Sequence, residues 1–469
     1  MDEVKLSDDV FEQIKDFNRR SLTEEQESLI DKLILNEELK NRYKLFGLCY
    51  ECKQPNISFN CQACDFKYFQ QNFKNWTSGN HDVDEFIQKT QLKAKHGYQL
   101  IEWIEYDEFE DIEYLAKGGF GITFKAIWRE GPIKKYSQGK RRGRTEVALK
   151  CLHNSQDITA DFLKEIESNI LACDVFIVRC YGITKDPKTN NFVMVMQLQE
   201  GSLRQYLNNN FISLDWEKKL GFLYCITRGL KTIYKRGLIH HDLHCGNILS
   251  GHGNTYITDL GLCQPANVKS SQDGNKKIYG VCPYVAPEVL RGKEYTQASD
   301  IYGFGIIAYE ICTGLPPYHD VAHDDFLAMK ICQGLRPTSN YKIPQLLFDI
   351  IIQCWDANPL KRPKADELCK SIRKMMISNI SKQKDSVIYK QGEEANEINK
   401  KSSLTVQSTL SSTGTLSYTT HPQAVYISKL LDFKNLPEPK NADNNEIEYS
   451  DTLKIDFTKL DINSKDESN

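Results

Sequence analysis

The stretch HHDLHCGNIL at residues 240–249, followed by TDLGL at 258–262, decides the fold of this chain. It places Asp242 and Asn247 five residues apart, with Asp259 twelve residues further on. Three more stretches then follow in order: VCPYVAPEVL (281–290), ASDIYGFGI (298–306) and CWDANPLKRP (354–363). Any one of these residues alone is compatible with ordinary structure, but chance assembly of the whole ordered set is negligible.

Three weaker signals lie upstream of that set. AKGGFGITF (116–124) is a glycine-rich turn between two predicted strands, and the backbone amides of such a turn can lie over phosphates. Lys150 belongs to the strand-like run VALK, and Glu165 lies on a predicted amphipathic helix. Taken alone, each of these features is more often a tight hairpin or a solvated face.

The hydrophobic periodicity changes along the chain from strand-like to helical. Alternating apolar residues predict strands of an antiparallel sheet at 122–128, 147–152 and 192–198. Beyond these strands the pattern is helical, with helices predicted at 298–313 and 344–355 among others. A strand-rich half that precedes a helix-rich half predicts an α+β arrangement with two lobes.

The ordered motifs resemble the protein kinase superfamily over residues 107–376, within the tyrosine-kinase-like branch of serine/threonine kinases. The resemblance implies a two-lobed protein kinase fold with an antiparallel-sheet N-lobe and a helical C-lobe. It also implies an enzyme of intracellular signalling that transfers the γ-phosphate of ATP to Ser/Thr hydroxyls of protein substrates, with ATP and Mg²⁺ as cofactors.

The resemblance assigns roles to individual residues. The catalytic residues that it implies are Asp242, Lys150, Asn247, Asp259 and His244. The nucleotide-binding residues are Ala116, Gly118, Gly119, Gly121, Thr123, Ala148, Lys150, Glu165, Met196 and Gln197. Asp242 would accept or orient the proton of the substrate hydroxyl, and Asn247 and Asp259 would hold Mg²⁺ as hard oxygen ligands. Lys150 would contact the α- and β-phosphates, with Glu165 as its helix partner.

Supporting roles follow from the same resemblance. Met196 is the expected gatekeeper at the back of the adenine pocket. Glu288 and Arg362 are expected to form an ion pair beneath the substrate platform, and Asp300 is expected to brace the catalytic loop from a buried helix.

The sequence departs from the kinase pattern at several positions. Ala116 replaces the first glycine of the phosphate turn, and His241 replaces an arginine that grips an activation-loop phosphate in many kinases. His244 and Val281 depart from both the serine/threonine and the tyrosine patterns, so the preferred hydroxyl stays open. The alternative function is a pseudokinase scaffold that binds ATP and recruits partners.

Fifteen cysteines are present, and four of them have the spacing of metal ligands. Cys49-x-x-Cys52 and Cys61-x-x-Cys64 predict a structural Zn²⁺ site in a zinc-ribbon-like module, because two such pairs can surround the metal tetrahedrally. A redox pair and unligated surface thiols are the alternatives. The layout resembles an expanded fungal set of kinase-like proteins with an N-terminal paired-cysteine module. Cys245 and Cys263 are the two further cysteines expected to be exposed near ATP.

Charge, hydropathy and the N-terminal residues limit which other functions and locations the sequence supports. The formal charge of −3 gives no support for nucleic-acid binding, and no apolar run is long enough for a membrane span. The N-terminus shows no signal peptide, which predicts a cytoplasmic location with the nucleus as an alternative. The basic segment 131–146 is either a solvated loop or a docking site for acidic partners.

The chain divides into five predicted segments. These are a helical N-terminal segment (1–48), a zinc-binding module (49–75), a helical linker (76–106), the kinase domain (107–376) and a largely disordered Ser/Thr-rich tail (377–469). Within the tail, 402–420 is a candidate autophosphorylation target. The apolar island 424–439 either docks a partner, as the paired-cysteine module also could, or packs back on the kinase domain.

Overall fold

The computed structural model describes residues 5–56, 61–94, 97–118, 121–133, 140–152, 160–261, 263–265, 278–381, 385–405 and 418–441. Gly119 and most of the candidate target 402–420 lie outside these residues. The chain forms two compact units. The first comprises residues 1–203, 225–240 and 246–270, and the second comprises 204–224, 241–245 and 271–469.

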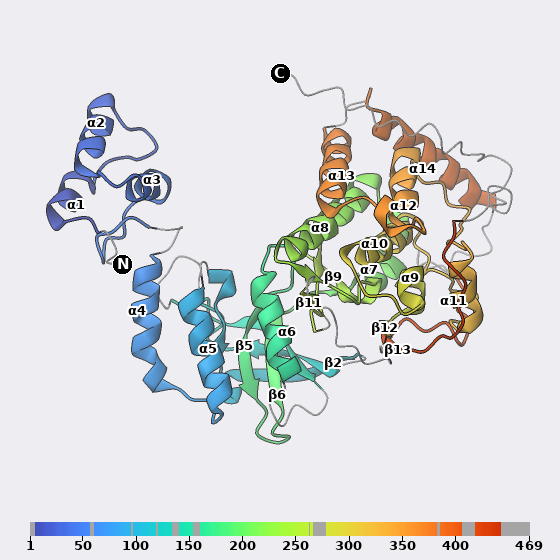
Figure 1. Cartoon of the computed structure of the whole chain (residues 1–469), viewed down its shortest axis with the longest axis horizontal. Coiled ribbons are helices and arrows are strands. Elements are labelled where there is room, and N and C mark those ends of the chain that lie inside the picture. The colour runs from blue at the N-terminus through green and yellow to red at the C-terminus, as the bar shows by residue number, and fades with distance from the viewer. Residues whose placement is uncertain are drawn as a thin grey trace. The chain divides into compact units, whose positions relative to one another are not determined.

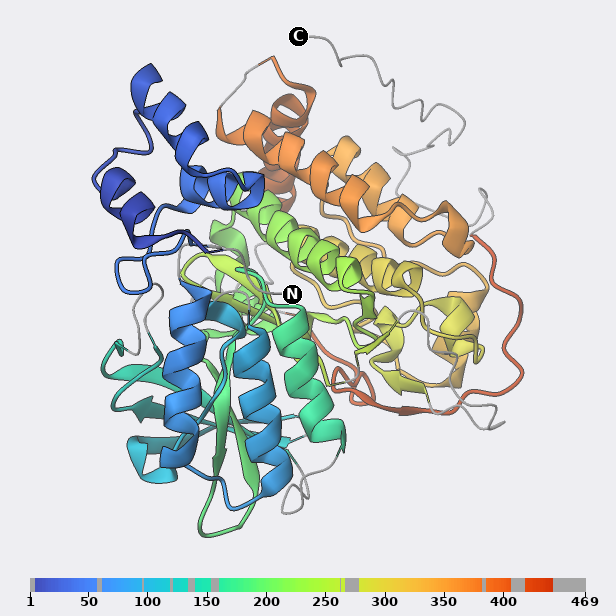
Figure 2. The same cartoon turned by 60° about the vertical axis from the view of Figure 1, so that its left-hand side comes forward.

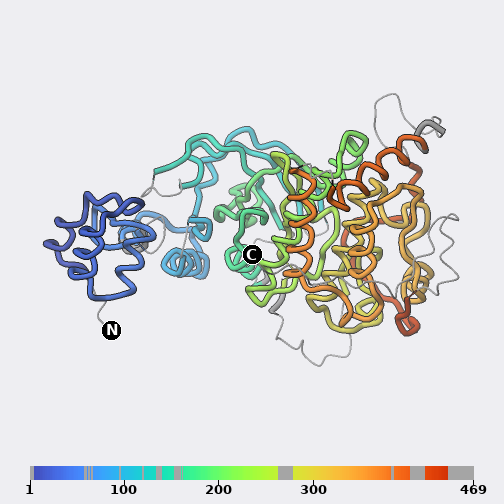
Figure 3. The backbone as a smooth tube through the Cα atoms, turned by 90° about the horizontal axis from the view of Figure 1, so that it is seen from above, coloured from blue at the N-terminus to red at the C-terminus, as the bar shows by residue number. Residues whose placement is uncertain are grey.

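Three short helices occupy the N-terminal segment: α1 (Asp8–Ile14), α2 (Glu24–Leu33) and α3 (Glu37–Phe46). A capping box starts α2, since the Thr23 hydroxyl accepts from the Gln26 N–H and the Gln26 side chain accepts from the Thr23 N–H. Ile14, Ile30 and Tyr43 contribute to an apolar cluster that these helices share. Figure 3 shows the helices gathered in a group at the N-terminus.

Helices α4 (Gln62–Asn72) and α5 (His81–Lys93) follow the cysteine segment. α5 packs with α6 (Ala160–Leu171) over one face of the large sheet, where Ile87 and Phe162 share a core (Figure 2). The segment predicted as a helical linker, 76–106, is therefore part of the sheet-bearing lobe. The reason is that Val83 and Ile87 on the apolar face of α5 pack in the same core as side chains of the sheet.

A six-stranded sheet forms the centre of the first unit, in the order β1-β5-β6-β4-β3-β2. Its strands are β1 (Glu102–Trp103), β2 (Phe109–Lys117), β3 (Gly121–Trp128), β4 (Thr145–Leu152), β5 (Cys180–Lys185) and β6 (Phe192–Gln197). Every neighbouring pair is antiparallel except β1 with β5. The predicted strands coincide with β3, β4 and β6, so this part of the prediction is confirmed.

The chain also contains short strands and single turns of helix. The short strands are β7 (Gly201–Ser202), β8 (Leu238–Ile239), β9 (Ile248–Gly251), β10 (Asn254–Ile257) and β11 (Gln264–Pro265). The single turns of 3-10 helix are η1 (Phe73–Asn75), η2 (Gly97–Gln99), η3 (Tyr106–Glu108), η4 (Phe211–Ser213), η5 (Cys245–Asn247), η6 (Cys282–Tyr284) and η7 (Pro359–Lys361). Strands β9 and β10 form an antiparallel hairpin that joins the residues before Asp259 to Asn247.

The second unit is helical. Its helices are α7 (Leu203–Asn210), α9 (Pro287–Leu290), α10 (Gln297–Thr313), α11 (Asp325–Cys332), α12 (Gln345–Cys354), α13 (Ala365–Ile380) and α14 (Val387–Thr405), while α8 (Trp216–Lys235) contributes residues to both units. The predicted helices at 298–313 and 344–355 correspond to α10 and α12. Residues 299–313 of α10 are all buried, as expected for a helix that is apolar on every side.

The tail contains more structure than its composition predicts. α14 docks through specific contacts: Gly392 lies against the Trp216 ring, and Asn399 exchanges hydrogen bonds with the backbone of Lys342. Residues 418–441 pack on the second unit, and β13 (Lys429–Leu431) pairs antiparallel with β12 (Ile278–Gly280), as Figure 1 shows. The prediction of a disordered tail is wrong for these segments. Specific hydrogen bonds hold them in place although they contain few apolar residues. Of the two alternatives for 424–439, the structure supports packing on the kinase domain.

No helix within the described residues combines the length and the apolar character that a membrane crossing needs.

Candidate active site and metal centre

Lys150 and its two carboxylate neighbours form the charged centre of the first unit. β4 holds Lys150, whose Nζ lies 2.6 Å from Glu165 Oε1 on α6 and 3.0 Å from Asp259 Oδ1. All three side chains are mostly buried. The predicted Lys150–Glu165 partnership is therefore present, although the two residues are fifteen positions apart in sequence.

Burial and charge set the protonation of this trio. Burial lowers the pKa of Lys150, but Asp259 and Glu165 outweigh it, so the pKa lies above its usual value. Burial raises the pKa of Glu165, which the Lys150 ammonium partly offsets. Two carboxylates share one ammonium, and the net negative charge suits a divalent cation.

The predicted nucleotide-binding residues lie in register across the sheet. Ala116 pairs with Thr123, and Thr123 pairs with Lys150, so these side chains share one face of β2, β3 and β4. The turn between β2 and β3 is closed by the Gly118 N–H, which donates to Gly121 O at 2.9 Å. Two residues before Lys150 on β4, Ala148 pairs with the buried Met196.

Gln197 ends β6 directly after Met196, where the strand leaves the sheet. Its N–H donates to Arg179 O at 2.8 Å. The structure thus brings together the described members of the predicted nucleotide set, while Gly119 lies outside the described residues.

Asn247 and Asp259 offer two hard oxygen donors in the same unit. The Thr258 N–H donates to Asn247 O at 3.0 Å, so the residue before Asp259 lies directly against Asn247. Asp259 itself adopts φ of 60°, and Leu260 after it is fully buried. A Cβ at Gly261 would come within 2.7 Å of Glu165 Oε2, which explains why glycine follows. This donor set fits Mg²⁺.

The loop that carries Asp242 and His244 belongs to the second unit, and both side chains are nearly fully buried. The loop is braced as predicted, because the His241 N–H donates to Asp300 Oδ1 on α10 at 3.1 Å. His241 has φ of 70°, and its ring stacks on Tyr295 with centroids 4.6 Å apart.

The predicted ion pair of Glu288 and Arg362 is confirmed. Two guanidinium nitrogens donate to the two carboxylate oxygens at 2.7 and 2.8 Å, and the Arg362 side chain is 0% exposed. Arg362 also donates to the Asp356 and Ala298 carbonyls. The pair therefore ties α9 to α10 and η7.

Two cysteines that the sequence predicts to be exposed are buried. Cys245 and Cys263 are both 0% exposed, so the expectation of exposure near ATP is wrong. Burial raises the pKa of Cys245 well above its usual value, with the Glu310 carboxylate adding to the effect. Both behave as small core residues, because the chain turns sharply at each and packs the side chain inward.

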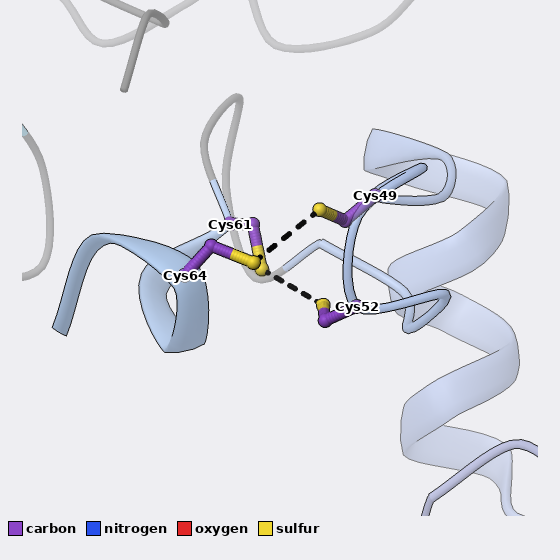
Figure 4. Close-up of side chains that lie close together, drawn as sticks. All are labelled: Cys49, Cys52, Cys61 and Cys64. Carbon is purple, nitrogen blue, oxygen red and sulfur yellow. Dashed lines mark hydrogen bonds between the residues drawn. The ribbon is translucent and has the colours of Figure 1, made fainter. Parts of the chain in front are cut away.

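The four N-terminal cysteines converge. All four sulfur atoms lie within 4.8 Å of one another, and Figure 4 shows their side chains turned toward a common centre. Cys49 and Cys52 come from the turn after α3, where the Cys49 N–H donates to Gln54 O and Lys53 adopts φ of 57°. Cys61 caps α4 and Cys64 follows within it. Four sulfur atoms gathered in this way form a group that can hold a metal ion.

Sequence reasoning missed Ser428 and the group that surrounds it. Ser428 lies in the apolar island of the tail and hydrogen-bonds Asp242 and His244. Beside it, Arg204 forms a buried ion pair with Glu310 at 2.7 Å. The available signal was a single serine at the centre of an apolar run, AVYISKLL (424–431), inside a polar tail.

Three features together define a protein kinase fold. They are a sheet lobe with a buried lysine–glutamate pair, a loop held by Asp300, and a helical lobe anchored by the Glu288–Arg362 ion pair. The family model of protein tyrosine and serine/threonine kinases matches residues 109–372, which is more than half of the chain. The chain belongs to this family.

Named relatives agree with the family assignment. The chain is 30% identical over 279 residues to the probable serine/threonine-protein kinase roco5 of Dictyostelium discoideum, a match that covers 55% of this chain and 9% of roco5. It is 31% identical over 294 residues to the ankyrin repeat-containing protein kinase A of the same organism, covering 59% of this chain and 19% of that protein. The chain thus spans a minor part of these relatives' length.

Proposed function

We propose that this chain is an active protein kinase that transfers the γ-phosphate of ATP to serine or threonine hydroxyls of protein substrates. The observation that carries the proposal is Lys150 held between Glu165 and Asp259 at 2.6 and 3.0 Å. A lysine fixed by a helix carboxylate is positioned to bind phosphates, which is the arrangement that phosphoryl transfer requires.

The other residues divide the remaining tasks. Asp242 would accept the proton of the acceptor hydroxyl, and Asn247 and Asp259 would hold Mg²⁺, which neutralises charge on the phosphates when bound. The row of Ala116, Thr123 and Lys150 would underlie the nucleotide. Catalysis in this scheme comes from positioning and charge neutralisation rather than from covalent chemistry.

A transfer assay with Mg·ATP and a degenerate serine/threonine peptide mixture tests the proposal. Lys150→Met and Asp242→Asn should each abolish transfer, while Lys89→Met on the exposed face of α5 should leave it unchanged. Nucleotide binding should survive in Asp242→Asn. Transfer by Asp242→Asn at the wild-type rate would refute the enzymatic role.

A pseudokinase scaffold is the competing function. The replacements at Ala116, His241, His244 and Val281 favour it. The intact Lys150–Glu165 pair supports catalysis instead. The two functions separate in the same assay, because a scaffold would bind ATP without transferring phosphate to any acceptor.

We also propose that Cys49, Cys52, Cys61 and Cys64 bind one structural Zn²⁺. The convergence of four sulfur atoms supports this, as does the small apolar content of the segment, since bound metal would supply folding energy. Four thiolates leave no open coordination position, so the module would serve partner docking rather than catalysis.

A further inference from the structure

Residues 418–441, here called the C-terminal strap, run in extended form along the second unit. The strap begins at Tyr418, whose hydroxyl donates to Asn208 Oδ1 at 3.0 Å. It ends at Asn441, whose side-chain oxygen accepts from the Ala357 N–H at 2.8 Å. Both ends of the strap are therefore fixed by hydrogen bonds within the second unit.

Ser428 of the strap occupies the acceptor position of the catalytic loop. Its hydroxyl donates to Asp242 Oδ2 at 2.5 Å and lies 3.0 Å from His244 Nε2. His244 Nε2 is itself 3.6 Å from the same carboxylate oxygen. Because the hydroxyl gives its single proton to Asp242, its lone pairs are left to accept from His244. The donation to Asp242 is the part of this arrangement that polarises the O–H bond, as a phosphate acceptor needs.

The backbone beside Ser428 is held as an added strand. Lys429, Leu430 and Leu431 of β13 pair with Gly280, Tyr279 and Ile278 of β12. Leu431 is 4% exposed, so its side chain is anchored while the flanking Leu430 faces outward. Strand addition with alternate buried side chains is a recognised mode of peptide binding.

Two anchors flank the strand. On one side, the Tyr426 ring lies over the Arg204 guanidinium at 4.4 Å, and its hydroxyl donates to Pro317 O at 2.9 Å. On the other side, Arg291 donates to both carboxylate oxygens of Glu438 at 2.5 Å. These contacts fix the register that places Ser428, rather than a neighbouring residue, at Asp242.

We propose that the strap is an intramolecular substrate and that Ser428 is its phosphoacceptor. In the reaction, Ser428 Oγ forms a bond to the γ-phosphorus of ATP as the bond to the bridging oxygen of ADP breaks. The hydroxyl proton passes to the Asp242 carboxylate, and ADP leaves with the bonding electron pair. The inference rests on the proposed kinase function and specifies a regulated site within it.

The docked strap also excludes other substrates. Ser428 already donates to Asp242 Oδ2, so a protein substrate that must place its own hydroxyl at that oxygen competes with the strap for one position. Phosphorylation adds about 1.5 to 2 negative charges next to the Asp242 carboxylate. Like-charge repulsion would then release the strap and open the site.

Phosphosite mapping of the full chain with Mg·ATP tests the acceptor. Ser428 should carry phosphate, Ser428→Ala should lose it, and Thr420→Ala, an exposed hydroxyl of the same strap, should keep it. A peptide of residues 423–433 should be phosphorylated on the serine that corresponds to Ser428. Transfer to exogenous peptides with no phosphate on Ser428 would overturn the inference and leave the kinase function standing.

A mixing experiment tests whether the step is intramolecular. The rate constant for Ser428 should not change on dilution, and a Lys150→Met chain mixed with wild type should remain unmodified at Ser428. Phosphate on Ser428 of the Lys150→Met chain would overturn the intramolecular step. No transfer to any acceptor by any variant would refute the kinase function and this inference together.

Charge exchange at the second anchor tests the blocking role without touching the catalytic loop. Glu438→Arg should lower the apparent KM for an exogenous peptide roughly three- to fivefold, because the exposed anchor is lost. The double variant Arg291→Glu/Glu438→Arg should restore the wild-type KM. An unchanged KM in the single variant, with thermal unfolding also unchanged, would show that the strap does not compete.

Discussion

Replacing Tyr426 by alanine removes the anchor that precedes Ser428. The wild-type ring stacks on Arg204, contacts His323 edge-on with centroids 4.8 Å apart and donates a hydrogen bond to Pro317 O. Tyr426→Phe removes only the hydroxyl. The pair of variants therefore separates the ring from its hydrogen bond, in a residue that does not contact Asp242.

The cost to strap docking can be worked out from these contacts. The cation–π contact is worth about 1 kcal/mol, the half-buried ring about 1 kcal/mol and the hydrogen bond about 1 kcal/mol. Tyr426→Ala thus weakens docking by about 3 kcal/mol and Tyr426→Phe by about 1 kcal/mol. At 1.36 kcal/mol per tenfold, these costs correspond to roughly 160-fold and fivefold changes in the docking equilibrium.

The assay is the apparent KM for an exogenous serine peptide, measured with Ser428→Ala in every chain so that self-modification cannot release the strap. Apparent KM rises with the docked fraction, so the alanine variant should show the lowest KM, the phenylalanine variant an intermediate one, and kcat should stay constant. Equal KM values in all three chains would refute the reasoning, as would a fall in kcat without a change in KM.

Three other perturbations have defined outcomes. A chelator should remove one Zn²⁺ per chain, and Cys61→Ser should prevent its binding while Cys173→Ser outside the cluster does not; absence of stoichiometric zinc in the purified chain would contradict the site. Burial lowers the pKa of Lys219 to about 8, although Phe211 and Trp216 surround its ammonium. The folded chain then binds fewer protons than the unfolded chain between about pH 8 and 10.5, so stability rises with pH in this window. The free energy of unfolding in urea, measured for Lys219→Met and for wild type, should differ in favour of Met near pH 8. This difference should shrink by about 3 kcal/mol as the pH rises to about 10.5, and a difference that does not change with pH would contradict the prediction. Arg362→Ala should lower the free energy of unfolding by about 3 to 5 kcal/mol because Glu288 loses its buried partner, and an additive Glu288→Ala/Arg362→Ala double variant would argue against coupling.

The kinase fold was predictable because local pattern and ordered motif agree. Alternation in 122–128 and 147–152 predicts strands that the sheet contains, and Lys150 and Glu165 meet because β4 and α6 are packed by the same apolar core. The cysteine pairs converge as predicted, because short turns leave each pair little freedom. In each of these cases, the residues that determine the structure are close in sequence or belong to one recognisable motif.

Other features depend on long-range contacts that no local pattern encodes. The sequence predicts α5 as a separate linker helix, yet its Val83 and Ile87 are part of the hydrophobic core that packs on the sheet. Composition predicts disorder for the tail, whereas the strap is held by polar contacts to residues 84 to 210 positions away, such as Ser428 to Asp242. Burial of Cys245 likewise depends on tertiary packing rather than on its place in the motif.

Two of the departures from the kinase pattern lie beside the strap, and this links them. His244, at the position where serine/threonine kinases usually carry lysine, contacts Ser428, and Val281 directly follows the strand that pairs with β13. His241 replaces the arginine that would grip an activation-loop phosphate, and its ring is stacked on Tyr295 instead. A histidine held in this way offers no bidentate fork for a phosphate. Under the proposed scheme, control of the active site therefore passes from the activation loop to the C-terminal strap, whose own serine carries the signal for release.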